Sequence, residues 1–189
     1  IFLLLAKAAG ATQGSQFAIT PTSYADFPYK ILRFGSAAAG ILLVAFMMLL
    51  VKEISKSATA GLFAGFLALF ENSLIVQSRY ILADIFILLF GIAGLWAFLR
   101  KEREKHQSLT WFLWLTLASI FFGLAIGAKV SGAIFLVTAW LYFLIKERRR
   151  LRNPAAIFFI FLIIIPVVTV FLLMLVHFLL FSPQEPVLT

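Results

Sequence analysis

Residues 57–99 form an almost uninterrupted apolar stretch, and its length constrains the fold more than any other feature of the sequence. As a single helix the stretch would be about 65 Å long, roughly twice the thickness of the hydrocarbon core of a bilayer. The chain must therefore fold back, and the polar cluster over residues 71–79 is the only plausible turn. Residues 109–146 would likewise form a helix of about 55 Å, and their turn is expected at residues 127–132.

The composition agrees with a hydrocarbon environment. Hydrophobic residues make up 63% of the chain and the mean hydropathy is +1.06, whereas a soluble domain is roughly 45–50% apolar. Side chains that face lipid can be as apolar as buried ones, and the 22 phenylalanines suit such surfaces. Cysteine is absent, which excludes disulfides and thiolate metal sites.

The sequence therefore predicts an all-α fold, a polytopic membrane helix bundle with about six transmembrane helices in one domain over residues 1–189. The spans are expected near residues 31–51, 57–76, 80–99, 109–127, 130–146 and 154–181. Residues 1–30 are expected to end an outer loop region, because they are rich in turn-forming residues. The first residue is Ile1, inside an apolar run too short to cross a bilayer, so we expect a fragment of a longer protein.

The basic residues indicate how the bundle is oriented. The net charge of +8 would favour nucleic acid as a partner of a soluble protein, but here basic residues flank apolar segments, so no nucleic-acid binding is expected. The breaks at 52–56, 100–105 and 146–152 hold most of the lysines and arginines. The positive-inside rule places these breaks in the cytoplasm. Residues 12–30, both turns and the C-terminus then lie on the outer or lumenal side.

Five ionisable residues gather at the outer ends of the predicted spans: Arg33, Glu71, Arg79, Asp84 and Lys129. A charge near hydrocarbon costs roughly 2.5–3.5 kcal/mol at the bilayer centre on insertion scales. The convergence favours a polar cavity that opens outward. The alternative is that these residues simply lie among the lipid headgroups.

The segment ENSLIVQSRYILADIFILLF, residues 71–90, resembles a stretch of the protein O-mannosyltransferases (dolichyl-phosphate-mannose–protein mannosyltransferases). The similarity is carried by Glu71 and Asn72, by the run QSRYIL at 77–82 and by Asp84. Weaker similarities lie in FPYKILRFGSAAAG, residues 27–40, and in GLAIGAKVSGAIFLV, residues 123–137.

The resemblance implies a glycosyltransferase of the GT-C fold. Such an enzyme moves mannose, or a related sugar, from a polyprenyl-phosphate carrier to a Ser or Thr hydroxyl of an acceptor protein at the outer or lumenal face. In that family the general base is an acidic residue of the first outer loop, followed by a His-Pro-Pro stretch. Neither is present here, so both are expected upstream of Ile1 and this fragment alone is expected to be inactive.

The donor leaves as a charged lipid phosphate, and cations at the outer ends of spans could hold that charge. Arg79, Lys129 and Arg33 are the candidate donor-phosphate ligands. The alternative for Arg79 is an interfacial anchor, and for Lys129 it is snorkelling to the headgroups. Asp84 and Glu71 are candidates for supporting roles, Asp84 also as a partner of Arg79 or Lys129. No catalytic residue is assigned, and neither a metal nor another cofactor is expected.

Two other readings remain open on the residues alone. The outer charges could mark the solute path of a transporter or permease fragment, although no inverted repeat is visible. A non-catalytic assembly subunit is a third possibility. The expected partners are membrane lipid, the lipid-linked sugar and an acceptor protein, with a dimer left open. The expected location is the cell membrane of a prokaryote or the endoplasmic reticulum of a eukaryote.

Overall fold

The computed structural model describes residues 29–79, 84–147 and 153–181, and this part of the chain consists of helices joined by short turns. The α-helices are α2 (Tyr29–Ser55), α3 (Ala58–Leu69), α4 (Asn72–Arg79), α5 (Asp84–Arg100), α6 (Leu109–Ala128), α7 (Ala133–Tyr142), α8 (Pro154–Phe159) and α9 (Ile165–Phe181). Short 3-10 turns, Lys101–Arg103 and Val130–Gly132, follow α5 and precede α7. A π-helical turn, Ile160–Ile164, joins α8 and α9 into one long rod.

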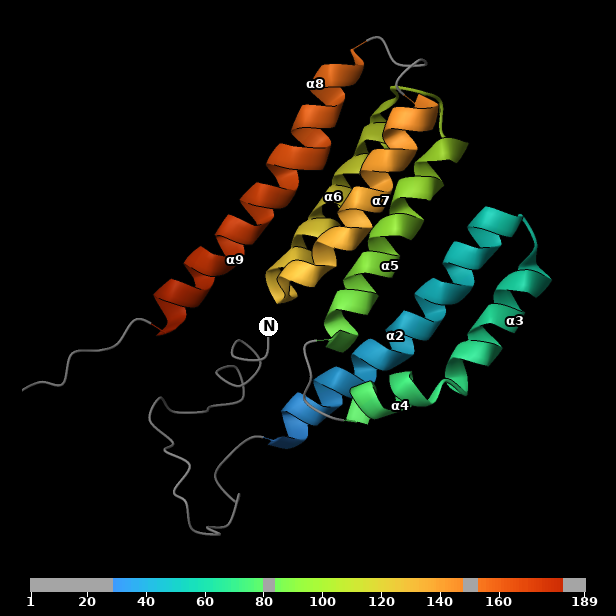
Figure 1. The fold of residues 1–189 in the computed structure, drawn as a ribbon, viewed down its shortest axis with the longest axis vertical. Coiled ribbons are helices and arrows are strands. Elements are labelled where there is room, and N and C mark those ends of the chain that lie inside the picture. Colours follow the sequence, from blue (N-terminus) through green and yellow to red (C-terminus); the bar gives the residue numbers. More distant parts are fainter. Residues whose placement is uncertain (1–28, 80–83, 148–152, 182–189) are drawn as a thin grey trace, which may run out of the picture.

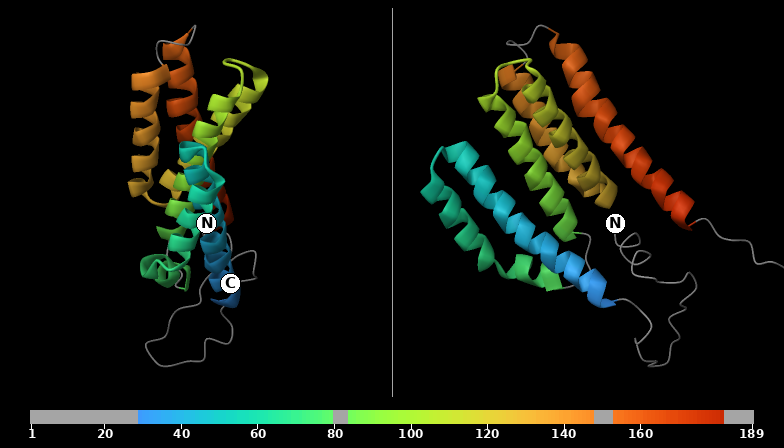
Figure 2. Two further views of the ribbon diagram at one scale, coloured as in Figure 1. Left: turned by 90° about the vertical axis from the view of Figure 1, so that its right-hand side faces the viewer. Right: turned by 180° about the vertical axis from the view of Figure 1, so that it is seen from behind.

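The long helices lie in a row, with α2, α5 and α7 running in one direction and α3, α6 and α9 in the other (Figure 1). Helix α2 packs on α3 and α5, α5 packs on α6, and α6 packs on α9. Figure 2 shows α3 at one edge of the row and α9 at the other. The last turns of α2 and α5 and the turn Phe143–Glu147 after α7 consequently lie at one end of the bundle, with the described basic residues of the breaks. The start of α2, the α4 segment and the α6–α7 junction lie at the opposite end.

The expected single helix over residues 57–76 is instead two helices. Helix α3 ends at Leu69, where the Phe70 N–H bonds back to Leu67 O at 3.1 Å. Helix α4 then begins at Asn72, and the Glu71 carboxylate accepts the Ser73 N–H at 3.2 Å. That carboxylate satisfies one of the donors left open at a helix start. The expected turn over residues 71–79 is thus largely helical, and α4 lies against the N-terminal part of α2 (Figure 1).

Among the residues that the structure describes, three helices are long and apolar enough to cross a membrane: Arg33–Ser55, Leu109–Ala128 and Ala155–Leu179. The apolar helices Ala58–Leu69 and Val130–Lys146 are shorter. With 12 residues, α3 is about 18 Å long, which is less than the hydrocarbon thickness. The six predicted span boundaries therefore remain a prediction, although the helices follow the same order along the chain.

Helix α5 lies between two buried clusters. Ile85, Phe86 and Leu89 at its start pack with Ala39 and Leu43 of α2. Ala97 and Phe98 at its end join residues of α6, α7 and the α8–α9 rod: Trp111, Leu115, Ala118, Phe122, Leu136, Ala139, Phe143, Ile157 and Leu162. Because both ends of α5 are held by packing, the residues that flank it, Asp84 and Lys101, have defined positions.

Glycines allow the helices to approach closely, as expected for small residues at membrane helix interfaces. The pair Gly61 and Gly65 packs against Met48 of α2. A Cβ atom on Gly123 would lie 2.6 Å from Thr169 Cβ and 2.9 Å from the Pro166 carbonyl oxygen of the α8–α9 rod. The α6–α9 contact therefore depends on the absence of a side chain at Gly123.

We expect Gly123→Ala to destabilise the protein, since backbone of the facing helix would have to move. Overpacking of this kind costs about 1–3 kcal/mol. Thermal unfolding of the full-length protein in detergent measures the effect. The matched control is Gly127→Ala, whose new Cβ would meet the movable Leu173 Cδ1 atom at 2.5 Å and should be tolerated better. Equal midpoints for the two variants would contradict this account.

Candidate functional site

An ion pair joins α5 to the end of α6 at the end of the bundle that the sequence predicts to face outward, called the outer end below. The Lys129 ammonium donates a hydrogen bond to Asp84 Oδ1 at 3.0 Å, so Asp84 binds one of the two partners, Arg79 and Lys129, that the sequence left open. Asp84 is the first residue of α5, where a carboxylate is favoured by the positive end of the helix dipole. Lys129 follows α6, and its own N–H closes that helix on Ala125 O at 3.2 Å.

The pair is open to its surroundings rather than buried. The Lys129 side chain is 58% exposed and that of Asp84 is 41% exposed. Exposed pairs contribute only about 0–1 kcal/mol to stability, so this one is a weak brace. An ammonium carries three N–H donors, and Asp84 occupies one of them. The arrangement can therefore present a cation at the outer surface while a carboxylate holds it in place.

Glu71 has a local structural function in this fold. Its Oε1 atom accepts the Ser73 N–H, as described above, so the carboxylate starts α4. Further along α4, the Gln77 Oε1 atom is buried and has no hydrogen-bond partner within the described part of the chain. Gln77 begins the QSRYIL run that carries the resemblance, but no role was assigned to its side chain, and an unpaired buried oxygen is energetically costly.

The other two predicted phosphate ligands lie at the same end. Arg33 is an exposed residue near the start of α2. Arg79 is the last residue of α4, and its side chain lies outside what the structure describes, as do residues 80–83. The structure therefore brings Asp84 and Lys129 together, and the proposed roles of Arg79, Arg33 and Lys129 stay predictions.

A second charged cluster, at the opposite end, was treated in the sequence only as a topology signal. The Glu53 carboxylate receives Arg103 from the α5–α6 turn, and Glu102 receives Lys101 and Lys146. In the sequence, this ion-pair cluster could have been predicted from the two glutamates, Glu53 and Glu102, that lie among the lysines and arginines of the breaks. No group of three or more His, Asp or Glu residues with metal-binding geometry occurs in the described ranges.

The row of long apolar helices, with charged residues at its outer end, defines a polytopic membrane helix bundle of the GT-C type. The fold is similar to that of a chain in the S. cerevisiae protein O-mannosyltransferase Pmt1-Pmt2 complex bound to the sugar donor. The TM-score is 0.79 and the identity 25%, over 94% of this chain and 26% of that chain. The model of the dolichyl-phosphate-mannose-protein mannosyltransferase family matches residues 7–182, so the chain belongs to that family.

Curated relatives occur in both eukaryotes and bacteria. The human protein O-mannosyl-transferase 1 is 34% identical over 115 residues, which are 59% of this chain and 15% of the relative. The polyprenol-phosphate-mannose–protein mannosyltransferase of Corynebacterium glutamicum is 30% identical over 118 residues, 53% of this chain and 23% of the relative. The chain thus spans less than a quarter of the length of either protein.

A double-mutant cycle on Asp84 and Lys129 tests whether the carboxylate acts through the lysine. In the full-length protein, Lys129→Gln should lower mannosyl transfer about 10²-fold, as loss of one charge-stabilising donor typically does. Asp84→Asn should cause a smaller loss, and the double variant should be no worse than Lys129→Gln. Melting temperatures should change little, because the pair is exposed.

Initial rates at varied donor concentration provide the measurement, and Lys129→Arg is the matched control that keeps the positive charge. Losses that multiply in the double variant would mean that the two residues act independently. Full transfer by Lys129→Gln would remove Lys129 from the site.

Proposed function

We propose that the full-length protein transfers a mannosyl residue from a polyprenyl-phosphate carrier to a Ser or Thr hydroxyl of an acceptor protein. The observation that carries the proposal is the family match over residues 7–182. This range includes the three candidate phosphate ligands, Arg33, Arg79 and Lys129. The named activities of the relatives, which belong to mannosyltransferases that use protein acceptors, point the same way.

In the reaction the acceptor oxygen bonds to the sugar carbon and the bond from that carbon to the phosphate oxygen breaks. The hydroxyl proton passes to a general base, and the polyprenyl phosphate leaves with an additional negative charge. Lys129 and, in the same role, Arg79 and Arg33 would hold this charge. Asp84 would keep the Lys129 ammonium in place through the 3.0 Å hydrogen bond.

The general base is proposed to lie outside this chain, in an outer loop that precedes it. Asp84 and Glu71 are assigned supporting roles, because one is paired with Lys129 and the other starts α4. The reaction would take place at the outer or lumenal face, in the endoplasmic reticulum of a eukaryote or the cell membrane of a bacterium. A dimeric assembly is part of the proposal, since the similar yeast structure is a Pmt1-Pmt2 complex.

Arg79→Ala in the full-length protein tests the proposed donor site. We expect a loss of about 10²–10³-fold in transfer from polyprenyl-phosphate-mannose to an acceptor peptide, because a cation beside the leaving phosphate is removed. Arg79→Lys should retain part of the activity, since it keeps the charge without the paired donors. Lys105→Ala, on the cytoplasmic side, removes a positive charge far from the proposed site without breaking the Arg103–Glu53 ion pair and serves as the control.

Undiminished transfer by Arg79→Ala would overturn the site assignment. The function as a whole is tested by the unmodified protein. Solute flux through vesicles in the absence of lipid-linked donor, together with no sugar transfer, would favour a permease instead.

A further inference from the structure

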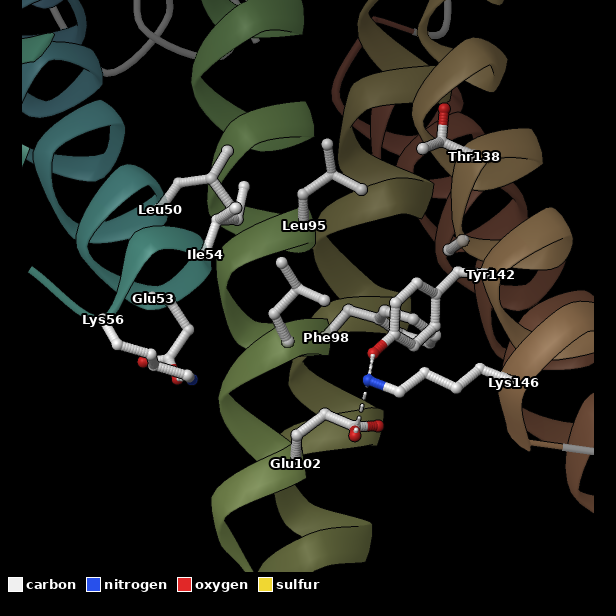
Figure 3. A pocket seen from close by; sticks show the side chains of 12 residues that line it. Leu50, Glu53, Ile54, Lys56, Leu95, Phe98, Glu102, Thr138, Tyr142 and Lys146 are labelled. Atoms are coloured by element: carbon white, nitrogen blue, oxygen red, sulfur yellow. Dashed lines mark hydrogen bonds and ion pairs between the residues drawn. The ribbon is translucent and has the colours of Figure 1, made fainter. Parts of the chain in front are cut away.

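A groove lies at the cytoplasmic end of the bundle, far along the helices from the Asp84–Lys129 pair. It runs over α5 between α2 and α7 and has a volume of about 580 Å³ (Figure 3). Its lining residues are Leu50, Glu53, Ile54, Lys56, Leu95, Phe98, Leu99, Glu102, Thr138, Ala139, Tyr142 and Lys146. Neither the proposed reaction nor the family match assigns a function to this groove.

The groove is apolar along its length and charged at one mouth. Leu50 and Ile54 of α2 and Leu95 of α5 form the apolar walls, and Thr138 lies on the α7 side (Figure 3). The charged residues of the mouth lie at the end of the bundle that carries the basic breaks. An occupant must therefore have a long apolar part and a polar head at the cytoplasmic membrane surface.

The mouth carries excess positive charge, and its carboxylates are already engaged. Glu53 is only 5% exposed and is bound by Lys56 and Arg103, each at 2.7 Å. Glu102 is bound by Lys101 at 3.4 Å and by Lys146 at 3.5 Å. The charged residues that line the mouth, Glu53, Glu102, Lys56 and Lys146, balance one another. Lys101 and Arg103 bind the same carboxylates from outside the lining and bring the ion-pair cluster to a net charge of +2, so the mouth favours an anion.

The anchoring of these groups makes the mouth a built feature rather than a set of loose surface lysines. Lys101 is fully buried, with its ammonium 4.0 Å from the centre of the Phe98 ring and 5.5 Å from that of Trp111. The Lys146 ammonium donates to the Tyr142 hydroxyl oxygen at 2.6 Å. Lys56 and Lys146 stand on opposite sides of the groove and remain 62% and 46% exposed.

We propose that this groove binds an anionic phospholipid of the cytoplasmic leaflet. An acyl chain would lie along the leucine-lined wall, and the headgroup phosphate would sit between the Lys56 and Lys146 ammonium groups. The cytoplasmic leaflet is the anionic one, which matches the charge of the mouth. A free phosphate ion would use only the mouth, whereas the lipid uses the apolar length of the groove as well.

The test uses the full-length protein in nanodiscs of phosphatidylcholine that contain a minor fraction of phosphatidylglycerol. Native mass spectrometry of the released protein counts the retained phosphatidylglycerol. We expect Lys56→Gln/Lys146→Gln to weaken retention about 25-fold, or about fivefold for each lysine at an anionic membrane surface. The control Lys52→Gln/Lys105→Gln removes the same charge from the same face but outside the groove, and should retain the lipid.

A second variant separates lipid binding from damage to the ion pairs. Thr138→Phe fills the groove without altering any charge and should also reduce retention, whereas Thr138→Val should not. If the control Lys52→Gln/Lys105→Gln lost as much phosphatidylglycerol as Lys56→Gln/Lys146→Gln, non-specific attraction to the basic surface would explain retention and the proposal would be overturned. Unchanged retention in Thr138→Phe, or a protein segment in the groove of the full-length structure, would overturn it too. Because the readout needs no sugar donor, its failure is distinct from failure of the proposed transferase activity.

Discussion

The packing of α5 on both of its sides is the interaction on which the rest of the structure depends. Its first turns pack on α2 and its last turns pack on α6 and α7, so the helix connects the two clusters of the core. The groups at its two ends are positioned by this packing, with Asp84 at the predicted outer end and Lys101 at the predicted cytoplasmic end. Neither charged group needs to stabilise the fold, because apolar packing already holds the helix.

The charged residues at the two ends of the bundle differ in their exposure and in their contacts. At the predicted outer end the exposed pair of Asp84 with Lys129 leaves the lysine accessible to the surroundings. At the cytoplasmic end, buried Glu53 and Lys101 belong to a connected set of ion pairs and aromatic contacts. An accessible cation suits a site through which a charged substrate passes. A buried network suits a permanent contact, such as a retained lipid.

The break between α3 and α4 shows that a polar interruption predicted as a turn can contain a short helix. The polar residues over 71–79 predict a turn between two spans, whereas the structure already ends α3 at Leu69. Their side chains favour more than a turn, however, because the Glu71 carboxylate caps a new helix. Hydropathy alone does not distinguish a polar turn from a short helix at the membrane surface, since both are polar interruptions between apolar segments.

The sequence by itself determined the class of fold, the helix order and the end at which each charged group lies. The lengths of the apolar segments and the distribution of Lys and Arg suffice for that. The bilayer thickness sets the length of each span, and the basic residues between spans set their orientation. The QSRYIL run carried the resemblance to the mannosyltransferase family. Only the tertiary structure decided that Lys129 meets Asp84, 45 positions away, and that Arg103 meets Glu53 across 50 positions. Such contacts depend on the rotation and offset of neighbouring helices, which side-chain packing sets and hydropathy does not encode.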